Sequence, residues 1–149
     1  MITLDFETFY DKDFSLTKLT TEEYVRHARF EVIGVAVKVN DGPTKWFTGD
    51  YAQTREWLEQ FDWNNHFALA HNAVFDAAIL TWRFGIRPKA WLDTLSMARA
   101  VLGPTVSVSL AKLAEHFGLG VKGTEVSEAR GLRRVDFPPD QLNQYGMYC

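Results

Sequence analysis

The amino-acid sequence predicts an α/β fold in which helices flank a mixed sheet, with three antiparallel strands first and parallel strands after them. Three observations lead to this prediction. Residues 2–9 alternate apolar and polar side chains as a strand does, residues 32–48 resemble two strands joined by a tight turn, and helical periodicity then alternates with short apolar segments. The 149 residues, 46% hydrophobic and 14% aromatic, are enough for a single domain that covers the whole chain, residues 1–149.

Each predicted strand has its own signal. The stretch ITLDFETF, residues 2–9, places Ile, Leu and Phe on one side and Thr, Asp and Glu on the other. The continuous apolar run VIGVAVKV, residues 32–39, is typical of a buried strand, and the Asn-Asp-Gly-Pro turn at 40–43 leads into a partner strand at 44–48. Two further short strands are expected at residues 67–70 and 90–92.

The predicted helices begin at capping residues and end at glycines. Thr20 and Glu23 have the spacing of a capping box for a short helix that ends near Ala28, and Asp50 is placed to cap the next helix. Three more stretches have helical spacing: residues 73–84, which Gly85 ends, residues 95–102, and a stretch around residues 110–117 that ends at Gly118.

The last segment, FPPDQLNQYGMYC, begins well as a helix, because proline suits the first turn and Asp140 favours the positive end of the helix dipole. Leu142, Tyr145 and Cys149 lie on one face of this helix. No capping glycine or basic last turn follows. We therefore expect the chain to be cut inside this helix and to be a fragment of a longer protein.

Composition and charge limit the class of protein. No apolar run is long enough to span a bilayer and no basic, apolar leader precedes the first strand, so we expect no membrane partner and a cytoplasmic location. Cys149 is the single cysteine, which excludes an internal disulfide and a CxxC zinc site. A net charge of −3 disfavours broad binding of nucleic acid through a basic surface. The basic groups at 83–89 and 130–134 either face solvent or approach phosphate.

Four acidic residues are candidates for chemistry. Asp76 lies within the apolar stretch ALAHNAVFDAAIL, where an unpaired carboxylate costs several kcal/mol or takes up a proton, so a cation or a donor cluster is expected beside it. Asp5 and Glu7 are two apart on the first strand and point to the same face. Asn72, four residues before Asp76, is expected on the same helical face. Asp93 is the fourth acid, again beside apolar neighbours.

Each candidate also has a structural explanation. A D-x-E pair on a half-exposed strand is often only surface decoration, Asn72 is a good helix N-cap, and Asp93 is placed to cap the helix that begins near Leu95. His71 either assists at the site or has a structural role at a strand end. Phe75 and Trp82 either stack on bases or belong to the core.

Hard oxygen ligands from separate elements, with no nearby cysteine and no HxxxH pair, favour Mg²⁺ or Mn²⁺ over Zn²⁺. Carboxylate clusters of this kind suit phosphoryl transfer with two metal ions, in which one activates water and the other stabilises the leaving oxygen. The acidic residues therefore predict a two-metal site that acts on a phosphodiester.

Two short motifs carry a family resemblance. DFET at residues 5–8 and HNAVFD at residues 71–76 resemble the first and second motifs of the DEDD superfamily of 3′-to-5′ exonucleases, which have a ribonuclease H-like fold. The wider chain, including EVIGVAVKV, LDTLSMARA and SLAKLAEHFGLGVKG, is similar to the proofreading exonuclease domain of phage and bacterial family A DNA polymerases. The resemblance covers nearly the whole sequence.

The resemblance implies a role for each motif residue. Asp5 and Glu7 would bind metal, Asp5 bridging both ions, and Asp76 would hold the second metal site through water, with Asn72 positioning Asp76 or the substrate. The family's third motif, Tyr-x-x-x-Asp, begins at Tyr148, which would orient the attacking water, and its aspartate would lie three residues beyond Cys149. The candidate substrate contacts are Thr8, His71, Asn72 and Phe75.

The sequence therefore predicts an exonuclease that uses two Mg²⁺ or Mn²⁺ ions to remove nucleotides from the 3′ end of single-stranded DNA, without sequence preference. A polymerase domain in the parent chain is the expected partner, in the cytoplasm of a bacterium or a phage-infected host, and activity of the fragment is expected to be impaired. One alternative is a non-catalytic nucleic-acid-binding or protein-docking module with the same fold. An aspartyl-phosphate phosphatase is disfavoured, because Glu7 stands where the DxDx[TV] motif of those enzymes has a second aspartate.

Overall fold

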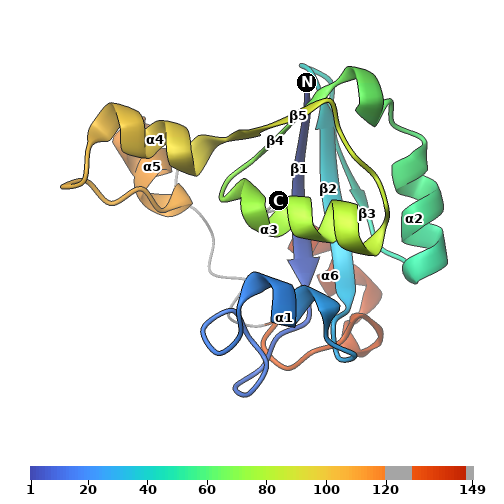
Figure 1. Cartoon of the computed structure of the whole chain (residues 1–149). Helices are drawn as coiled ribbons and strands as arrows, with labels where there is room; N and C mark the ends of the chain where they lie inside the picture. Colours follow the sequence, from blue (N-terminus) through green and yellow to red (C-terminus); the bar gives the residue numbers. More distant parts are fainter. Residues whose placement is uncertain (120–128, 147–149) are drawn as a thin grey trace.

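The computed structural model describes residues 1–119 and 129–146, and its centre is a five-stranded sheet (Figure 1). The strand order is β3-β2-β1-β4-β5, in which β1 pairs antiparallel with β2, β2 antiparallel with β3, β1 parallel with β4, and β4 parallel with β5. The predicted mixed sheet is therefore confirmed. The strands are β1 (Ile2–Thr8), β2 (Val32–Val39), β3 (Thr44–Phe47), β4 (Phe67–Ala70) and β5 (Ala90–Asp93).

The helices start where the capping residues predict. Thr20 and Glu23 form both hydrogen bonds of a capping box, and Asp50 forms a second capping box with Gln53. The helices are α1 (Thr21–Arg26), α2 (Tyr51–Glu59), α3 (Ala73–Ala78), α4 (Thr94–Leu102), α5 (Leu110–His116) and α6 (Pro139–Gly146), with short 3₁₀ turns at Trp63–Asn65 and Arg134–Asp136.

Two predicted helix boundaries differ in the structure. The helix after Thr20 ends at Arg26, two residues before Ala28. The single helix expected over residues 73–84 is instead α3 followed by a π-helical turn, η2 (Ile79–Arg83). Periodicity cannot separate the two, because one wider turn leaves the apolar pattern almost unchanged. Gly85 ends the segment as expected, with a positive φ of 72°.

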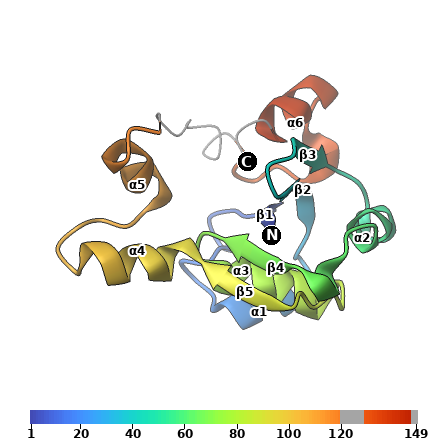
Figure 2. The same cartoon turned by 90° about the horizontal axis from the view of Figure 1, so that it is seen from above.

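Helices cover both faces of the sheet: Figure 2 shows α3 and α1 on one side and α6 on the other. The main core lies beneath α3, α1 and α2, and it includes the inward side chains of β1, which are Ile2, Leu4 and Phe6. A smaller core on the α6 face joins Ile33 to Phe137, Leu142 and Tyr145. The half-buried residues of β1 are Thr3, Asp5 and Glu7, on the face opposite the main core.

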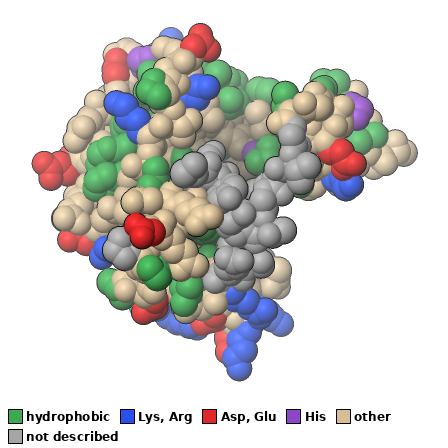
Figure 3. Space-filling model, turned by 180° about the vertical axis from the view of Figure 1, so that it is seen from behind, with side chains coloured by type: hydrophobic (Ala, Val, Ile, Leu, Met, Phe, Trp, Pro, Cys, Tyr) green, Lys and Arg blue, Asp and Glu red, His purple; other side chains and the backbone are tan. Residues whose placement is uncertain are grey.

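Helices α4 and α5 project away from the sheet (Figures 1 and 2). None of the residues of α4 is buried. Seen from behind, hydrophobic side chains are visible on this projecting part (Figure 3), where Val101, Phe117 and Leu119 are exposed. In the part of the chain that the structure describes, no helix has the length and apolar character needed to cross a membrane.

Candidate active site

The candidate site forms where β4 separates from β1. Strand β1 pairs with β2 along its whole length, but only its first two residues, Ile2 and Thr3, pair with β4. Further along β1, a backbone N–H on the β4 side needs a partner from outside the sheet. Asp76 of α3 supplies it, since its Oδ1 accepts a hydrogen bond from the Phe6 N–H at 3.1 Å. The fold thereby fixes Asp76 against the residue between Asp5 and Glu7.

Asp76 is an electrostatically costly residue at this position. Only 3% of it is exposed, and burial raises the pKa of its carboxyl well above the ordinary value. The negative charges of Asp5 and Glu7 raise this pKa further, while the Phe6 N–H opposes the rise. The structure therefore brings Asp76 within electrostatic reach of both carboxylates of β1, as the sequence predicts.

Helix α6 reaches the site through Tyr145, which was predicted only to share one face of the last helix with Leu142 and Cys149. Its hydroxyl donates a hydrogen bond to Glu7 Oε2 at 2.7 Å. Tyr148, the tyrosine predicted for the site, lies outside the described residues, as does Cys149. Tyr145 is buried beside Leu142. Its position three residues after Leu142, which places both side chains on one helical face, is the sequence signal that could have indicated its burial.

Asn72 differs from both of its predicted placements. It adopts a left-handed backbone, φ 65°, and sits before the first turn of α3, where its side chain makes no capping hydrogen bond. It is exposed whereas Asp76 is buried, so the two residues do not share a helical face. The prediction failed because it assumed a continuous helix through residue 72, and asparagine is one of the few residues that adopts the left-handed conformation readily.

Asp93 has a structural role. Its Oδ1 accepts from the backbone N–H groups of Asn72 (2.9 Å), Ala73 (3.2 Å) and Leu95 (3.1 Å), and its Oδ2 accepts from Ser96 Oγ (2.6 Å). Burial alone would raise the pKa of Asp93, but these donors outweigh burial and lower it. Capping of α4 by Asp93 is thus confirmed, and the same carboxylate holds the junction between β4 and α3.

The other predicted substrate contacts occupy different environments. Thr8 is buried, with its hydroxyl 2.9 Å from the Tyr24 hydroxyl, and Phe75 packs at the edge of the main core. His71 is half-buried, and its Nδ1 lies 3.0 Å from Thr94 Oγ1. Trp82, in contrast, is 43% exposed, which excludes a purely internal role for it. Thr8 and Phe75 are therefore held inside the fold, whereas His71 lies at the end of β4 beside the α3 junction.

The acidic residues suit a divalent cation by charge and by donor chemistry. The negative charges of Asp5 and Glu7 act on Asp76, which is buried and has a strongly raised pKa, so a bound cation would relieve the repulsion. All three offer hard oxygen donors. Among residues 1–119 and 129–146, however, no group of three acidic, histidine or cysteine side chains is already close enough to hold an ion. The three carboxylates therefore fit a divalent cation by their charge and by the type of donor atom that they offer.

Comparisons with known proteins find solved structures with a similar fold. Solved structures of NrnC from Brucella melitensis resemble the chain: one with bound Mg²⁺ at 15% identity and a TM-score of 0.66, and one bound to pGG at 15% identity and 0.67. Each covers 99% of this chain, which spans 65% of the NrnC chain. A further structure, described as the apo form of the nuclease, has 19% identity and a TM-score of 0.65, covering 97% of this chain and 63% of its own.

No curated protein matches the sequence significantly. A family model described as 3′-5′ exonuclease matches residues 20–146, which is most of the chain. The matched region includes the HNAVFD motif at residues 71–76 and begins after the DFET motif, and the similar structures agree with the ribonuclease H-like fold. The chain therefore belongs to the 3′-5′ exonuclease family.

Proposed function

We propose that this protein hydrolyses the terminal phosphodiester at the 3′ end of single-stranded DNA, in the manner of a proofreading exonuclease. The observation that carries the proposal is the position of Asp76, a buried carboxylate fixed to the backbone between Asp5 and Glu7. Three carboxylates held at the carboxyl end of a parallel strand pair suit the binding of cations and phosphate. The family match supports 3′-to-5′ exonuclease chemistry in general.

Asp5, Glu7 and Asp76 are the residues we expect to hold two ions of Mg²⁺ or Mn²⁺. Bound ions would lower the pKa of the attacking water and stabilise the leaving oxygen. The Mg²⁺ in one NrnC structure favours magnesium, and the pGG in another favours a substrate made of nucleotides. Removal of one terminal nucleotide after another needs only phosphate, sugar and an unpaired base, so no sequence preference is expected.

The remaining residues would position these groups. The Phe6 N–H holds one oxygen of Asp76, and the Tyr145 hydroxyl orients Glu7. By the family pattern, Tyr148 would orient the attacking water together with an aspartate beyond residue 149. Asn72 and His71, at the junction of β4 and α3, are the proposed substrate contacts that lie outside the core, whereas Thr8 and Phe75 are held inside the fold.

The alternative is a non-catalytic module that binds nucleic acid or docks another protein. One observation favours it: within the described residues, no three side chains of metal-binding type are yet close enough to hold an ion. The alternative predicts that Mg²⁺ neither binds tightly nor raises the melting temperature, whereas binding to the folded state must raise it in the catalytic case.

The test is degradation of a 5′-labelled single strand by the chain and by a version extended through the final helix, each with and without Mg²⁺. With Mg²⁺ the extended version should shorten the strand from its 3′ end, and Asp5→Ala should lower the rate at least about a hundredfold. Parallel reactions with RNA, and with a strand blocked at its 3′ end, test substrate and polarity.

Two outcomes would count against the proposal. Equal degradation by Asp5→Ala and the unmutated protein would indicate a contaminating nuclease. No degradation by the extended version, together with no thermal stabilisation by Mg²⁺, would favour the non-catalytic module.

A further inference from the structure

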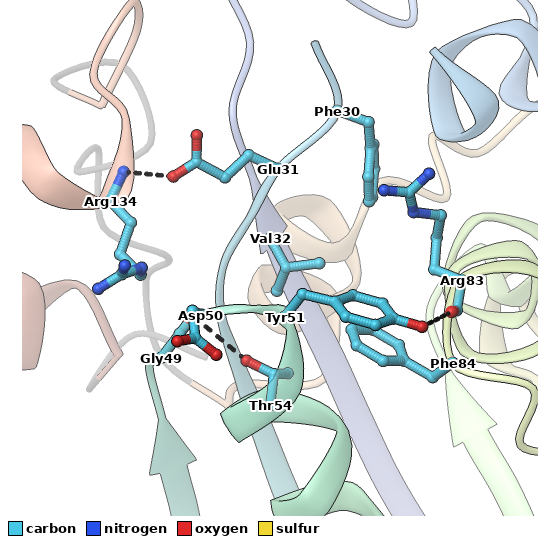
Figure 4. Close-up of a pocket in the computed structure, with 10 residues that line it drawn as sticks. All are labelled: Phe30, Glu31, Val32, Gly49, Asp50, Tyr51, Thr54, Arg83, Phe84 and Arg134. Carbon is cyan, nitrogen blue, oxygen red and sulfur yellow. Dashed lines mark hydrogen bonds between the residues drawn. The ribbon is translucent and has the colours of Figure 1, made fainter. Parts of the chain in front are cut away.

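A pocket separate from Asp5, Glu7 and Asp76 lies between the start of β2, the start of α2, the π-helical turn η2 and the turn at Arg134 (Figure 4). Its volume is about 240 Å³. We call it the Tyr51 pocket, and its lining residues are Phe30, Glu31, Val32, Gly49, Asp50, Tyr51, Thr54, Arg83, Phe84 and Arg134. These residues come from four separate parts of the chain.

Tyr51 is an exposed aromatic ring that the fold holds in place. One face stacks on Phe84, with ring centroids 5.3 Å apart and an interplanar angle of 11°, and its hydroxyl donates to the Arg83 carbonyl oxygen at 2.6 Å. Nevertheless 50% of Tyr51 is exposed. An aromatic ring that is fixed before a ligand arrives loses little entropy on stacking, so Tyr51 is suited to bind a flat ring.

Two arginines supply positive charge to this pocket. The Arg83 guanidinium lies 5.2 Å from the Phe30 ring centroid, and Arg134 lies on the opposite wall (Figure 4). Arg83 comes from the basic group at 83–89 and Arg134 from the basic group at 130–134, and the fold brings these two residues to one pocket. In the part of the chain that the structure describes, neither guanidinium forms an ion pair with a carboxylate.

The two acids of the pocket already have partners. Glu31 accepts from Arg133 Nη1 at 2.6 Å and from the backbone N–H of Arg134 at 3.1 Å. Asp50 caps α2, accepting from the Gln53 N–H at 2.9 Å. With the acids engaged in this way, the guanidinium groups of Arg83 and Arg134 remain available to a phosphate.

The aromatic and basic pattern continues next to the Tyr51 pocket. An adjoining hollow is lined by Tyr51, Trp82 and Arg83. Trp82 is exposed, and the Arg26 guanidinium lies 4.7 Å from its ring centroid. Trp82 and Arg83 both lie on the π-helical turn, an element that is frequent at functional sites. Rings and arginines that alternate along a surface are typical of single-stranded nucleic-acid binding.

We propose that the Tyr51 pocket binds one base and its phosphate within single-stranded nucleic acid, the base on the Tyr51 ring and the phosphate on Arg83 and Arg134. The pocket lies at the same end of the sheet as the acidic residues, because its Val32 pairs with Thr8 at the end of β1. It lies on the opposite face of the sheet from Asp5 and Glu7. Phe84 of the pocket stacks on Phe6, on the main-core face of β1, whereas Glu7 contacts α6 on the other face. It is therefore a second contact for a strand, separate from hydrolysis.

The test is binding of a 5′-fluorescent oligothymidylate of about 15 nucleotides, measured by anisotropy in EDTA so that no metal-dependent cleavage occurs. Tyr51→Ala should weaken binding about fivefold or more, and Tyr51→Phe, which keeps the ring, should stay close to the unmutated protein. Arg134→Ala should weaken binding and reduce the slope of log K against log salt by about 0.7. The matched controls are Phe67→Ala and Arg87→Ala, exposed residues at the other end of the sheet, which should change nothing.

An abasic strand of the same length separates stacking from charge. It should bind more weakly than the oligothymidylate, and Tyr51→Ala should have no further effect on it, whereas Arg134→Ala should. Thermal melting of each variant verifies that it is folded. The statement that this strand is also the substrate of the enzyme rests on the proposed function. Binding of the strand in EDTA is independent of that function.

No measurable binding by the unmutated chain, or equal affinity of the folded Tyr51→Ala, Arg134→Ala and control variants, would overturn the inference. Loss of binding in Tyr51→Ala combined with no hydrolysis by the extended chain would leave the pocket standing and remove the proposed exonuclease function.

Discussion

Asp76→Asn separates the charge of the buried carboxyl from its hydrogen bond. Asparagine has nearly the shape of aspartate, and its Oδ1 can still accept from the Phe6 N–H, which lies 3.1 Å from the Asp76 oxygen. The substitution therefore removes the negative charge that burial and the neighbouring carboxylates disfavour. Without metal, the variant should be more stable than the unmutated protein at neutral pH.

The sign follows from linkage. The pKa of Asp76 is raised in the folded protein, so the folded state holds a proton that the unfolded chain loses near the ordinary aspartate pKa of about 3.9. The free energy of unfolding should therefore fall as the pH rises from that value to the folded pKa, and stay level above it. Asp76→Asn should remove this fall, gaining on the order of 1–3 kcal/mol at neutral pH, or about 2–12 °C in Tm for a domain of this size.

The assay is thermal and urea unfolding of both proteins between about pH 4 and pH 8, first in EDTA and then in Mg²⁺. In EDTA the variant should be the more stable at neutral pH, and the two curves should approach each other at the acid end. Mg²⁺ at a hundred times its Kd should stabilise the unmutated protein by about 2.7 kcal/mol and the variant much less. A variant that is less stable in EDTA at neutral pH, or equal stabilisation of both by Mg²⁺, would refute the reasoning.

Three further predictions concern the supports of the site. Asp93→Asn should destabilise the protein by roughly 1–2 kcal/mol at neutral pH. Because the pKa of Asp93 is lowered in the folded protein, its carboxylate stabilises the fold above the ordinary aspartate pKa, and this stabilisation is lost as the pH falls. Urea unfolding at two pH values would detect the difference, and the stabilisation by Mg²⁺ should be unchanged. Tyr145→Phe should lower the free energy of unfolding, measured in urea, by about 1 kcal/mol, because it removes the hydroxyl that donates a hydrogen bond to Glu7. An unchanged free energy of unfolding would indicate that this hydrogen bond is absent in solution. Gly34→Ala should lower Tm by an amount equivalent to about 1–3 kcal/mol, because a Cβ there would lie 2.2 Å from a ring carbon of Trp46; an unchanged Tm would contradict this packing.

Local signals were sufficient for most of the elements. The capping boxes at Thr20 and Asp50 depend on residues three apart, and the stop at Gly85 depends on one residue, so each can be recognised without knowledge of the fold. The π-helical turn could not be predicted in this way, because the wider turn leaves the apolar pattern of residues 73–84 nearly intact. The left-handed Asn72 was missed for a related reason: its backbone hydrogen bond goes to Asp93, in a different strand.

The sequence by itself determined the order of strands and helices, the acidic residues of β1 and α3, and the unusual position of Asp76 in an apolar segment. These features follow from side-chain periodicity and from the energetic cost of burying a charge, both of which act within a few residues. Only the tertiary structure decided which groups meet: Tyr145 with Glu7, 138 residues apart, and Arg83 with Arg134 around Tyr51. Such contacts depend on how whole layers pack against the sheet, and that packing is determined by the main core and the α6 core together.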